Sequence, residues 1–471
     1  MTTTDPALWS ATELVRAYRR RLLSPIEVAR ACLARIRRLD PLVGAFALVD
    51  EEGALAAARA AEARWLRGEP AGPVDGAPAT IKDLTLMRGF VTRRGSRTTE
   101  GEAPDAVDAP VVARLREAGA VLLGKTTTPE FGWKGVTDNP LGQIARNPWD
   151  TARTAGGSSG GAAVAAALGL GALHQGSDGG GSIRIPAGFT GIVGFKPTFG
   201  RVPHWPASPF GTVSHSGPMT RTVSDAALML NVLARPDRRD WSALPSEVRD
   251  WRIGLEDGIR GLNILASLDL GHVPVDPEVA TAFANALEVL RDLGARVIER
   301  DPGIGDGRSI FERWWFAAAA FLVSRIPEER HGMLDPGLVE IAALGARTSA
   351  FELQRLQLER AAYAERIEAV FAEADLLVTP TLPIAAFETG LEVPAGGPYR
   401  RWTEWTPFTW PFNLGQQPAL SVPCGFTREG LPVGLQIVGP KYADALVIRA
   451  GRAFESACPQ PMAGEPRTRP S

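Results

Sequence analysis

Lysine is scarce in this chain of 471 residues, in which only five of the 51 basic residues are lysine. The five are Lys82, Lys125, Lys134, Lys196 and Lys441. A general compositional preference for arginine would leave lysine at positions where arginine cannot serve. The main such position is that of a base, because arginine stays charged whereas a buried lysine can lose its proton near neutral pH. Lys82 follows the apolar run A-P-A-T-I and is a candidate base, with a solvated or helix-capping charge as the alternative.

Cysteine, net charge and long hydrophobic runs are also in short supply. Three widely spaced cysteines (Cys32, Cys424 and Cys458) indicate neither a disulfide framework nor a zinc site. A net charge of −2 argues against nucleic acid or an anionic membrane as the main partner. The most apolar run, 162–173, is shorter than the roughly 20 residues of a membrane span. Because the N-terminus also lacks the pattern of a signal peptide, we expect a soluble cytoplasmic protein.

Stretches typical of strands alternate with stretches typical of helices, which predicts an α/β fold. We expect an N-terminal helical segment over residues 1–65, since S-A-T-E and S-P-I-E both fit the capping box of a helix start. The main domain is predicted over 66–460, with a helical insertion at about 300–374 and an aromatic-rich loop at about 384–412. The tail 461–471 is expected to be loose. A strand is predicted to begin at 251–255.

Two short motifs match nucleotide or hydrolase signatures, and we reject both. Residues 119–126 fit the phosphate-binding pattern G-x-x-x-x-G-K-T, but the variable positions Ala-Val-Leu-Leu are typical of a strand rather than an open loop. Residues 156–160 fit G-x-S-x-G, which requires a preceding buried strand and a later histidine. No strand pattern precedes them, and nothing marks His215, the histidine that follows a plausible loop, as a base.

The segment 156–200 carries two glycine-rich loops that each contain a serine. Ser158 lies in G-G-S-S-G-G, and Ser182 lies in S-D-G-G-G-S-I-R-I-P. Serine needs a base to act as a nucleophile, and a neutral Lys82 could serve, with one serine relaying the proton. Consecutive glycine amides could surround a developing oxyanion. The alternative is that these glycines only permit tight packing near a turn.

These motifs together resemble the amidase signature family, and the likeness extends over residues of about 20 to 440. Besides the two serine loops and I-K-D (81–83), the resemblance rests on G-F-K-P-T-F-G-R (194–201), G-K-T-T-T-P-E-F-G (124–132), H-S-G-P-M-T-R-T-V (215–223) and F-N-L-G-Q-Q-P-A-L-S-V-P (412–423). The resemblance implies a single α/β unit whose central twisted, mixed β-sheet of about 11 strands is covered by helices on both faces.

The resemblance also implies a set of catalytic roles. Ser182 would be the nucleophile, Ser158 a bridging serine on a cis peptide, and Lys82 the base. The backbone amides of Gly179, Gly180, Gly181 and Ser182 would form the oxyanion hole. No metal or cofactor is needed.

Three further residues are expected to support the site. The resemblance places Asp178 and Arg184 as an ion pair that holds the nucleophile loop, and Ser159 as loop support. At 177–179 this chain reads S-D-G where many family members have T-D-T. The additional glycine is expected to leave the amides usable but to loosen the loop.

The expected substrate class follows from the aromatic side chains and from the family resemblance. Aromatic side chains in the insertion and in the aromatic-rich loop suggest a wide apolar pocket, with the protein core as their alternative location: Trp133, Trp314, Trp315, Trp402, Trp405, Phe408 and Trp410. Residues 390–400 could be a mobile lid. We expect an amidase that acts on bulky amides, anilides or carbamates (urethanes), with esters as a further class, as a monomer or homodimer. The alternatives are the glutaminase component of a glutaminyl-tRNA amidotransferase, which hands ammonia to a partner complex, and an inactive binding module.

Overall fold

The computed structural model describes residues 5–245, 247 and 249–468 and contains one 11-stranded sheet in the order β1-β3-β2-β4-β6-β5-β10-β11-β9-β7-β8. The strands are β1 Phe46–Val49, β2 Pro78–Lys82, β3 Val121–Thr126, β4 Leu173–Asp178, β5 Val193–Lys196, β6 His215–Thr220, β7 Asn263–Ala266, β8 Arg296–Glu299, β9 Leu376–Pro380, β10 Ala419–Phe426 and β11 Pro432–Val438. The sheet is mixed, because parallel trios at β3-β2-β4 and β9-β7-β8 flank a central antiparallel group. The predicted α/β fold with about 11 strands is confirmed.

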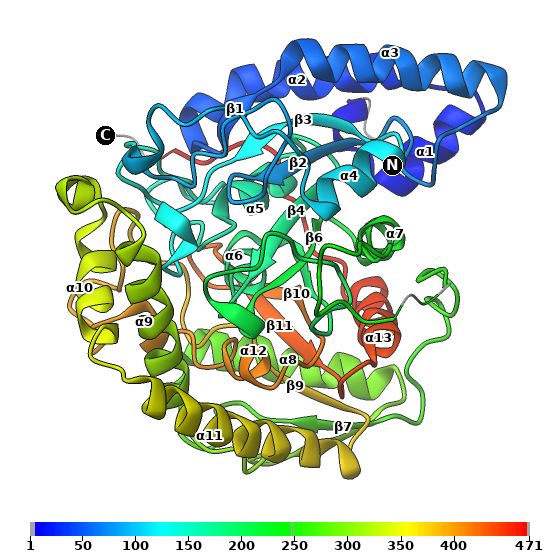
Figure 1. Cartoon of the computed structure of the whole chain (residues 1–471). Coiled ribbons are helices and arrows are strands. Elements are labelled where there is room, and N and C mark those ends of the chain that lie inside the picture. The colour runs from blue at the N-terminus through cyan, green and yellow to red at the C-terminus, as the bar shows by residue number, and fades with distance from the viewer. Residues whose placement is uncertain (1–4, 246, 248, 469–471) are drawn as a thin grey trace.

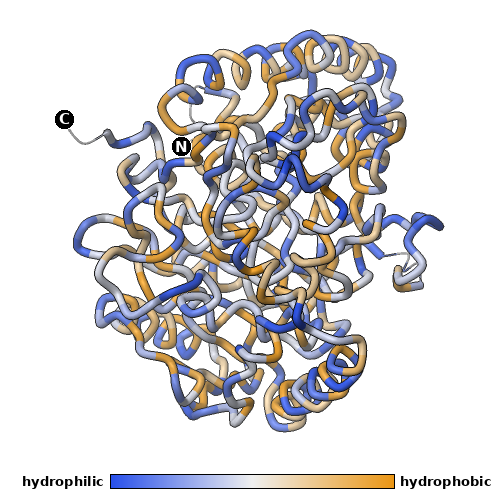
Figure 2. Tube along the Cα trace, turned by 60° about the vertical axis from the view of Figure 1, so that its left-hand side comes forward, coloured by the Kyte–Doolittle hydropathy of each residue, from blue (hydrophilic) through white to orange (hydrophobic). Residues whose placement is uncertain are grey.

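Helices cover both faces of this sheet (Figure 1). They are α1 Ala11–Arg19, α2 Pro25–Val43, α3 Glu51–Arg67, α4 Pro110–Glu117, α5 Gly160–Ala167, α6 Arg184–Thr190, α7 Val223–Leu233, α8 Pro277–Asp292, α9 Arg308–Ser324, α10 Pro336–Gly345, α11 Ala350–Ala369, α12 Pro411–Leu414 and α13 Asp444–Ala457. Along the helices at the rim, hydrophobic and hydrophilic residues alternate (Figure 2), as expected for helices that bury one face only. Within the described residues, no helix is both long and apolar enough to cross a membrane.

The first 65 residues are mostly helical, and both expected capping boxes are present. Ser10 and Glu13 cap α1, and Ser24 and Glu27 cap α2. The sequence reading missed β1, which runs antiparallel to β3 and forms one edge of the central sheet. The N-terminal segment is therefore part of the sheet rather than only a layer packed on it. Residues 1–4 of that predicted segment lie outside the described residues.

Helices α9, α10 and α11 form the predicted helical insertion, which lies along one side of the molecule (yellow in Figure 1). The predicted strand at 251–255 is wrong, because this stretch forms turns and the next strand is β7. Asp250 explains the difference. Its carboxylate accepts hydrogen bonds from the backbone and guanidinium of Arg252, and Gly254 follows with a positive φ of 78°. Both features are typical of turns.

The tail does not match its predicted looseness. Ala463 is buried, the backbone of Arg467 exchanges hydrogen bonds with Pro148 and Thr151, and Glu465 pairs with Arg38 on α2 at 2.7 Å. Polar and proline-rich composition misled the prediction because these residues are held by backbone bonds rather than by a hydrophobic pattern. Residues 469–471 of the predicted tail lie outside the described residues.

Candidate active site

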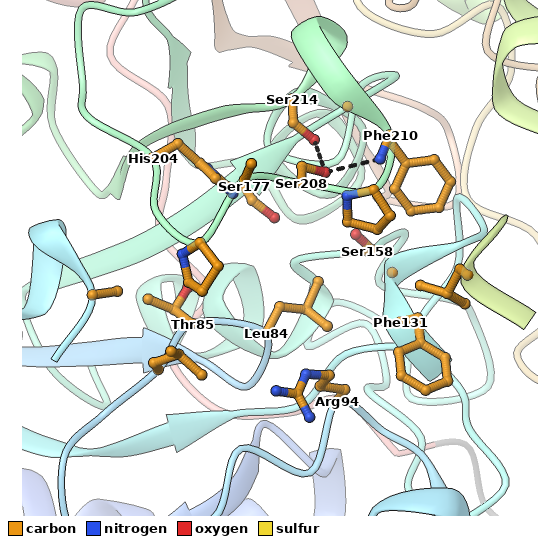
Figure 3. A pocket seen from close by; sticks show the side chains of 18 of the residues that line it. Leu84, Thr85, Arg94, Phe131, Ser158, Ser177, His204, Ser208, Phe210 and Ser214 are labelled. Carbon is orange, nitrogen blue, oxygen red and sulfur yellow. Dashed lines mark hydrogen bonds between the residues drawn. The ribbon is translucent and has the colours of Figure 1, made fainter. Parts of the chain in front are cut away.

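The candidate site forms where two parallel strands end. Strands β2 and β4 are parallel neighbours, so their carboxyl ends, at Lys82 and Asp178, meet at the same edge of the sheet. The loops that enter α5 and α6 bring Ser158 and Ser182 to the same edge, where both line one cavity together with Ser177 (Figure 3). The structure thus brings together Lys82, Ser158 and Ser182, the residues that the sequence singled out.

Lys82 is fully buried among hydroxyl groups. Its Nζ lies 2.7 Å from Ser158 Oγ, 2.8 Å from Ser159 Oγ and 3.0 Å from Ser177 Oγ. Ser159 uses its own proton to donate to the carbonyl oxygen of Ser177, so toward Lys82 it can only accept. A neutral amine has two N–H groups and one lone pair. With one N–H on Ser159, the lone pair remains for the hydroxyl proton of Ser158 or Ser177.

The surroundings of Lys82 favour this neutral form. Burial lowers the pKa of Lys82 well below its usual value, and the charge of Asp178 opposes the change only in part. No carboxylate of the described residues lies within ion-pair distance of Nζ. The start of α5 at Gly160 adds a partial positive charge beside the amine, which also favours the neutral state. A neutral amine is what a general base requires.

The loop that carries Ser158 contains a cis peptide bond between Gly157 and Ser158, as the resemblance implied. Glycine is required at 157, because an added Cβ would meet the backbone carbonyl of Val136 at 2.5 Å. The hydroxyl of Thr137 secures both sides of the turn by donating to the carbonyl of Gly156 and accepting from the amide of Gly160. Val136 and Thr137, which precede the loop in the sequence, thus hold Ser158 in place beside Lys82.

The loop 178–184, which carries Ser182, folds around the carboxylate of Asp178. Asp178 Oδ1 accepts the amide of Gly181 at 2.7 Å, and Oδ2 accepts the amide of Ile183 at 3.2 Å. Arg184 pairs with both oxygens at 3.0 Å, and both side chains are fully buried. Burial by itself would raise the pKa of Asp178, but the pairing with Arg184 outweighs it and holds the pKa well below its usual range.

The predicted oxyanion hole requires one correction. The amide of Gly181 points to Asp178, so it is not available to a substrate. The amides of Gly179, Gly180 and Ser182 have no acceptor among the described residues and remain free to donate. The sequence could not reveal this division, because it depends on how the Asp178 carboxylate turns back onto its own loop.

The glycines of this loop also permit close packing. A Cβ on Gly179 would meet the ring of Trp315 at 3.0 Å, and one on Gly180 would meet Phe311 at 2.5 Å and Trp402 at 2.9 Å. The sequence left two roles open for these glycines, exposed amides and tight packing, and both therefore apply. The same missing side chains that leave amides exposed on one side let an aromatic cluster approach from the other.

That cluster contains three of the seven aromatic residues predicted to line the substrate pocket: Trp315, Trp402 and Trp410. Phe311 stacks on Trp315 and on Trp410, with ring centroids 5.4 Å and 5.7 Å apart, and Trp402 meets Phe311 edge-on. Of the seven predicted residues, only Trp315 lines the cavity. The pocket assignment does not match the position of the other six, which support the nucleophile loop or fill the core: Trp133, Trp314, Trp402, Trp405, Phe408 and Trp410.

The cavity has a volume of about 890 Å³, within the range of ligand pockets. The sequence reading missed most of its walls, which come from residues 84–111, 131–132, 203–216 and the end of α9 with the turn after it. The aromatic lining consists of Phe131, Trp205, Phe210, Trp315 and Phe321. Figure 3 shows Phe131 and Arg94 on one side of the cavity, with Phe210, Ser208 and Ser214 on the opposite side.

Within the part of the chain that the structure describes, no histidine forms a hydrogen bond with Ser158 or Ser182. His215 is buried on β6, and its Nδ1 lies 2.7 Å from the carbonyl of Val213. His204 lines the cavity with its Nδ1 3.2 Å from Ser216 Oγ, and burial lowers its pKa. Among the described residues, no group of three or more histidine, cysteine or acidic side chains is arranged to hold a metal ion. Residues 121–126 of the rejected phosphate-binding motif form β3, so these positions are a strand, as expected.

Known proteins resemble this chain over nearly its whole length. The family model described as Amidase matches residues 27–448. The A-type subunit of the glutamyl-tRNA(Gln) amidotransferase of Myxococcus xanthus is 40% identical over 91% of this chain and 93% of that protein. The acylamidase of Rhodococcus erythropolis is 37% identical over 96% of this chain and 95% of that protein. A solved bacterial aryl acylamidase of the amidase signature family superposes with a TM-score of 0.90 at 33% identity, covering 96% of each chain.

Proposed function

The chain belongs to the amidase family and is a hydrolase acting on amide C–N bonds, and from this premise we propose that it cleaves bulky amides, anilides or carbamates through an acyl-enzyme on Ser182. One observation carries the proposal. The buried amine of Lys82 lies 2.7 Å from the hydroxyl of Ser158, and Ser158 and Ser182 line the same cavity. A base, a relay and a nucleophile are thus assembled at a space large enough for a substrate.

The proposed cycle is an acyl transfer. Ser182 Oγ forms a bond with the substrate carbonyl carbon while its proton passes to Ser158 and the proton of Ser158 passes to Lys82. The C–N bond then breaks as the amine leaves with the proton returned by the lysine. Water attacks the acyl-enzyme along the same relay, which releases the acid and restores Ser182.

The free amides of Gly179, Gly180 and Ser182 are the proposed donors to the oxyanion. Each such donor is typically worth roughly 3–4 kcal/mol of transition-state stabilisation. Asp178 and Arg184 act as positioning residues, because they hold the loop from which these amides project. The buried ion pair keeps its geometry through contacts of Arg184 with the carbonyl of Thr409 and the side chain of Gln436, both at 2.8 Å.

The walls of the cavity support an aryl or other bulky apolar group. Phe131, Phe210 and Trp315 line the same space as the two serines. The similarity to an acylamidase and to an aryl acylamidase points in the same direction. Carbamates fit the same mechanism, since their carbonyl also carries a C–N bond, and esters are the related class with an oxygen leaving group.

A component of an amidotransferase is the second candidate, favoured by the 40% identity to the Myxococcus xanthus protein. It predicts glutamine as the substrate and a stable complex with other proteins. The stand-alone amidase predicts a monomer or homodimer that acts without partners in the cytoplasm. Light scattering of the purified chain and assays with glutamine separate the two.

The test is amine release from a panel of p-nitroanilides, aryl carbamates, aliphatic amides and glutamine, with the Ser182→Ala variant alongside. We expect turnover of the bulky compounds that is lost in the variant. A serine-directed fluorophosphonate probe, followed by mass spectrometry, should label Ser182. Activity on glutamine alone would favour the amidotransferase, and absence of both labelling and turnover would favour an inactive binding module.

A further inference from the structure

The cavity that contains Ser158 and Ser182 carries an excess of positive charge. Its walls include Arg94, Arg325 and Arg330, and Glu102 is the one carboxylate among the described lining residues. His204 adds no charge near neutral pH because burial lowers its pKa. The whole chain has a net charge of −2, so this concentration of cations is not a general property of the protein.

The three arginines differ in their partners. Arg94 is satisfied by Glu102 at 3.1 Å. Neither Arg325 nor Arg330 has a carboxylate of the described chain within ion-pair distance. Arg330 donates one N–H to the carbonyl of Thr98 at 2.8 Å, and the guanidinium of Arg325 lies 5.8 Å from the ring centre of Phe321.

Arginines elsewhere on the same helix show that this is a local feature. Arg308 and Arg313 on α9 pair with Glu404 and Glu359, whereas Arg325, the C-cap of this helix, has no such partner among the described residues. Two acidic residues of the following turn, Glu328 and Glu329, do not line the cavity. The pairing seen along α9 therefore stops where the helix reaches the cavity.

Arg325 and Arg330 line the cavity from other segments of the chain than Ser158 and Ser182. Arg325 and Arg330 belong to the end of α9 and to the short helix Glu328–Met333, which faces the loop around Thr98. In Figure 3, Leu84 lies between Arg94 and Ser158. Leu84 and Phe131 add apolar surface to the same cavity. A ligand that reaches both the serines and the arginines would place an uncharged body near Ser182 and an anionic group at the arginines.

We propose that the substrate is an amide or anilide that carries a carboxylate remote from the scissile bond, and that Arg325 and Arg330 bind this carboxylate. The inference rests on the proposed function, since it names the substrate class of the same site. Guanidinium groups suit the role, because their planar N–H donors match the two oxygens of a carboxylate. Arg325 and Arg330 are specificity residues in this scheme and do not touch the reacting atoms.

The experiment compares two p-nitroanilides with acyl chains of equal length. One chain ends in a carboxylate, as in the monoanilide of a linear dicarboxylic acid, and the other ends in a hydroxymethyl group. We expect kcat/KM to be about tenfold higher for the carboxylate, which corresponds to about 1.4 kcal/mol. A series of chain lengths should show one optimum, because the distance between the arginines and Ser182 is set by the fold.

Variants assign this preference to its residues. Arg325→Gln and Arg330→Gln should each lower the ratio of the two kcat/KM values several-fold, and the double variant should abolish it. Arg325→Lys should keep part of the preference, because it keeps the charge. Arg347→Gln, at an exposed arginine after α10 that does not line the cavity, should leave the ratio unchanged. Raising the salt from about 0.01 M to about 1 M, which shortens the screening length from about 30 Å to about 3 Å, should also reduce the ratio.

The outcomes are distinguishable from failure of the proposed function. A wild-type ratio near one, or a ratio that persists in the double variant, would overturn the anion site even if both compounds are hydrolysed. If neither compound is hydrolysed, the proposed function fails, and titration calorimetry of both compounds with Ser182→Ala still decides the site. Preferential binding of the carboxylate that disappears in Ser182→Ala/Arg325→Gln/Arg330→Gln supports it. Equal binding of the two compounds contradicts it.

Discussion

The surroundings of two buried lysines on neighbouring strands show how one side chain can be a base or a structural cation. Lys82 ends β2 and Lys125 lies on β3, where Ile81 is the partner of Lys125 in the parallel register. Because side chains alternate along a strand, the two lysines project from opposite faces of the sheet. Lys82 meets three serine hydroxyls and no carboxylate, whereas Lys125 lies 2.9 Å from Asp83 and 2.6 Å from Thr92 Oγ1.

The two lysines differ in the neighbouring groups that compensate for the loss of hydration on burial. Burial lowers the pKa of both lysines, but at Lys125 the charge of Asp83 opposes the change directly. We infer that Lys125 is held as half of an ion pair, while Lys82 is held as a neutral amine. Hydroxyl groups can satisfy an amine without favouring its charge, which makes them suitable neighbours for a base.

The largest effect is expected for Lys82→Met, which keeps the length of the side chain and removes the base. We expect kcat/KM to fall by about 10²- to 10⁴-fold, which is the usual contribution of a general base. The free energy of unfolding should not fall near neutral pH, because a neutral amine leaves no charged partner behind and methionine avoids the cost of deprotonating the lysine on folding. Activity on the best panel substrate and urea denaturation measure the two quantities. A large loss of stability would contradict the neutral assignment.

Lys125→Met tests the other lysine and should show the reverse pattern. Removing the cation leaves the buried carboxylate of Asp83 unpaired, which typically costs about 3–5 kcal/mol. Adding Asp83→Asn should restore part of that loss, because the orphaned charge is then removed. Activity per folded molecule should stay within a few-fold of the wild type. If Lys125→Met were instead stable and inactive, the division of roles between the two lysines would be wrong.

The pH dependence of activity sharpens the comparison. Only the unprotonated amine acts as a base, so kcat/KM should fall as pH falls through the lowered pKa of Lys82. Ser177→Asp places a carboxylate beside Lys82, as Asp83 lies beside Lys125, and should raise the pKa of the lysine. The acid limb of the profile should then move to higher pH by about 1–3 units. Ser177→Asn, which adds a side chain of similar size without the charge, is the matched control.

The same lowered pKa has a consequence for stability. Lys82 binds a proton more weakly in the folded chain than in the unfolded chain, so its contribution to the free energy of unfolding rises as pH increases. That gain occurs between the lowered folded pKa and the ordinary lysine value of about 10.4. Asp178 has a folded pKa below its usual range, so its contribution is lost as pH falls through the acidic range. Chemical denaturation across pH, with Lys82→Met as reference, isolates the lysine.

The scarcity of lysine in the sequence indicates buried lysines better than it indicates a catalytic base. Lys82, Lys125, Lys134 and Lys196 are all buried. Lys134 pairs with Asp138 and Asp335, and Lys196 donates to the carbonyls of Pro197 and Gln417. Only the partners separate a base from a structural cation, and those partners come from loops distant in sequence. Local pattern alone cannot supply them.

The aromatic residues are a second case in which the local sequence does not reveal the role of a side chain. Trp402 and Trp410 have the size and polarity expected of pocket residues, but they pack behind the glycines of the nucleophile loop. A core and an apolar pocket select the same side chains, so composition does not distinguish them. The α/β fold with about 11 strands could be anticipated, because the motifs that carry the family resemblance are contiguous in sequence. The cavity walls could not, since they come from four separate segments.

The smallest expected effects come from removing one hydroxyl beside each lysine. Ser159→Ala deletes the acceptor that fixes one N–H of Lys82, so the lone pair of the amine is less well aimed at Ser158. We expect kcat to fall about fivefold, equivalent to the roughly 1 kcal/mol of a single hydrogen bond. Thr92→Val deletes the hydroxyl beside Lys125 and should cost about 1 kcal/mol of stability with little change in kcat. Equal effects of the two variants on kcat would mean that hydroxyl contacts stabilise both lysines in the same way, and the contrast between them would then rest on Asp83 alone.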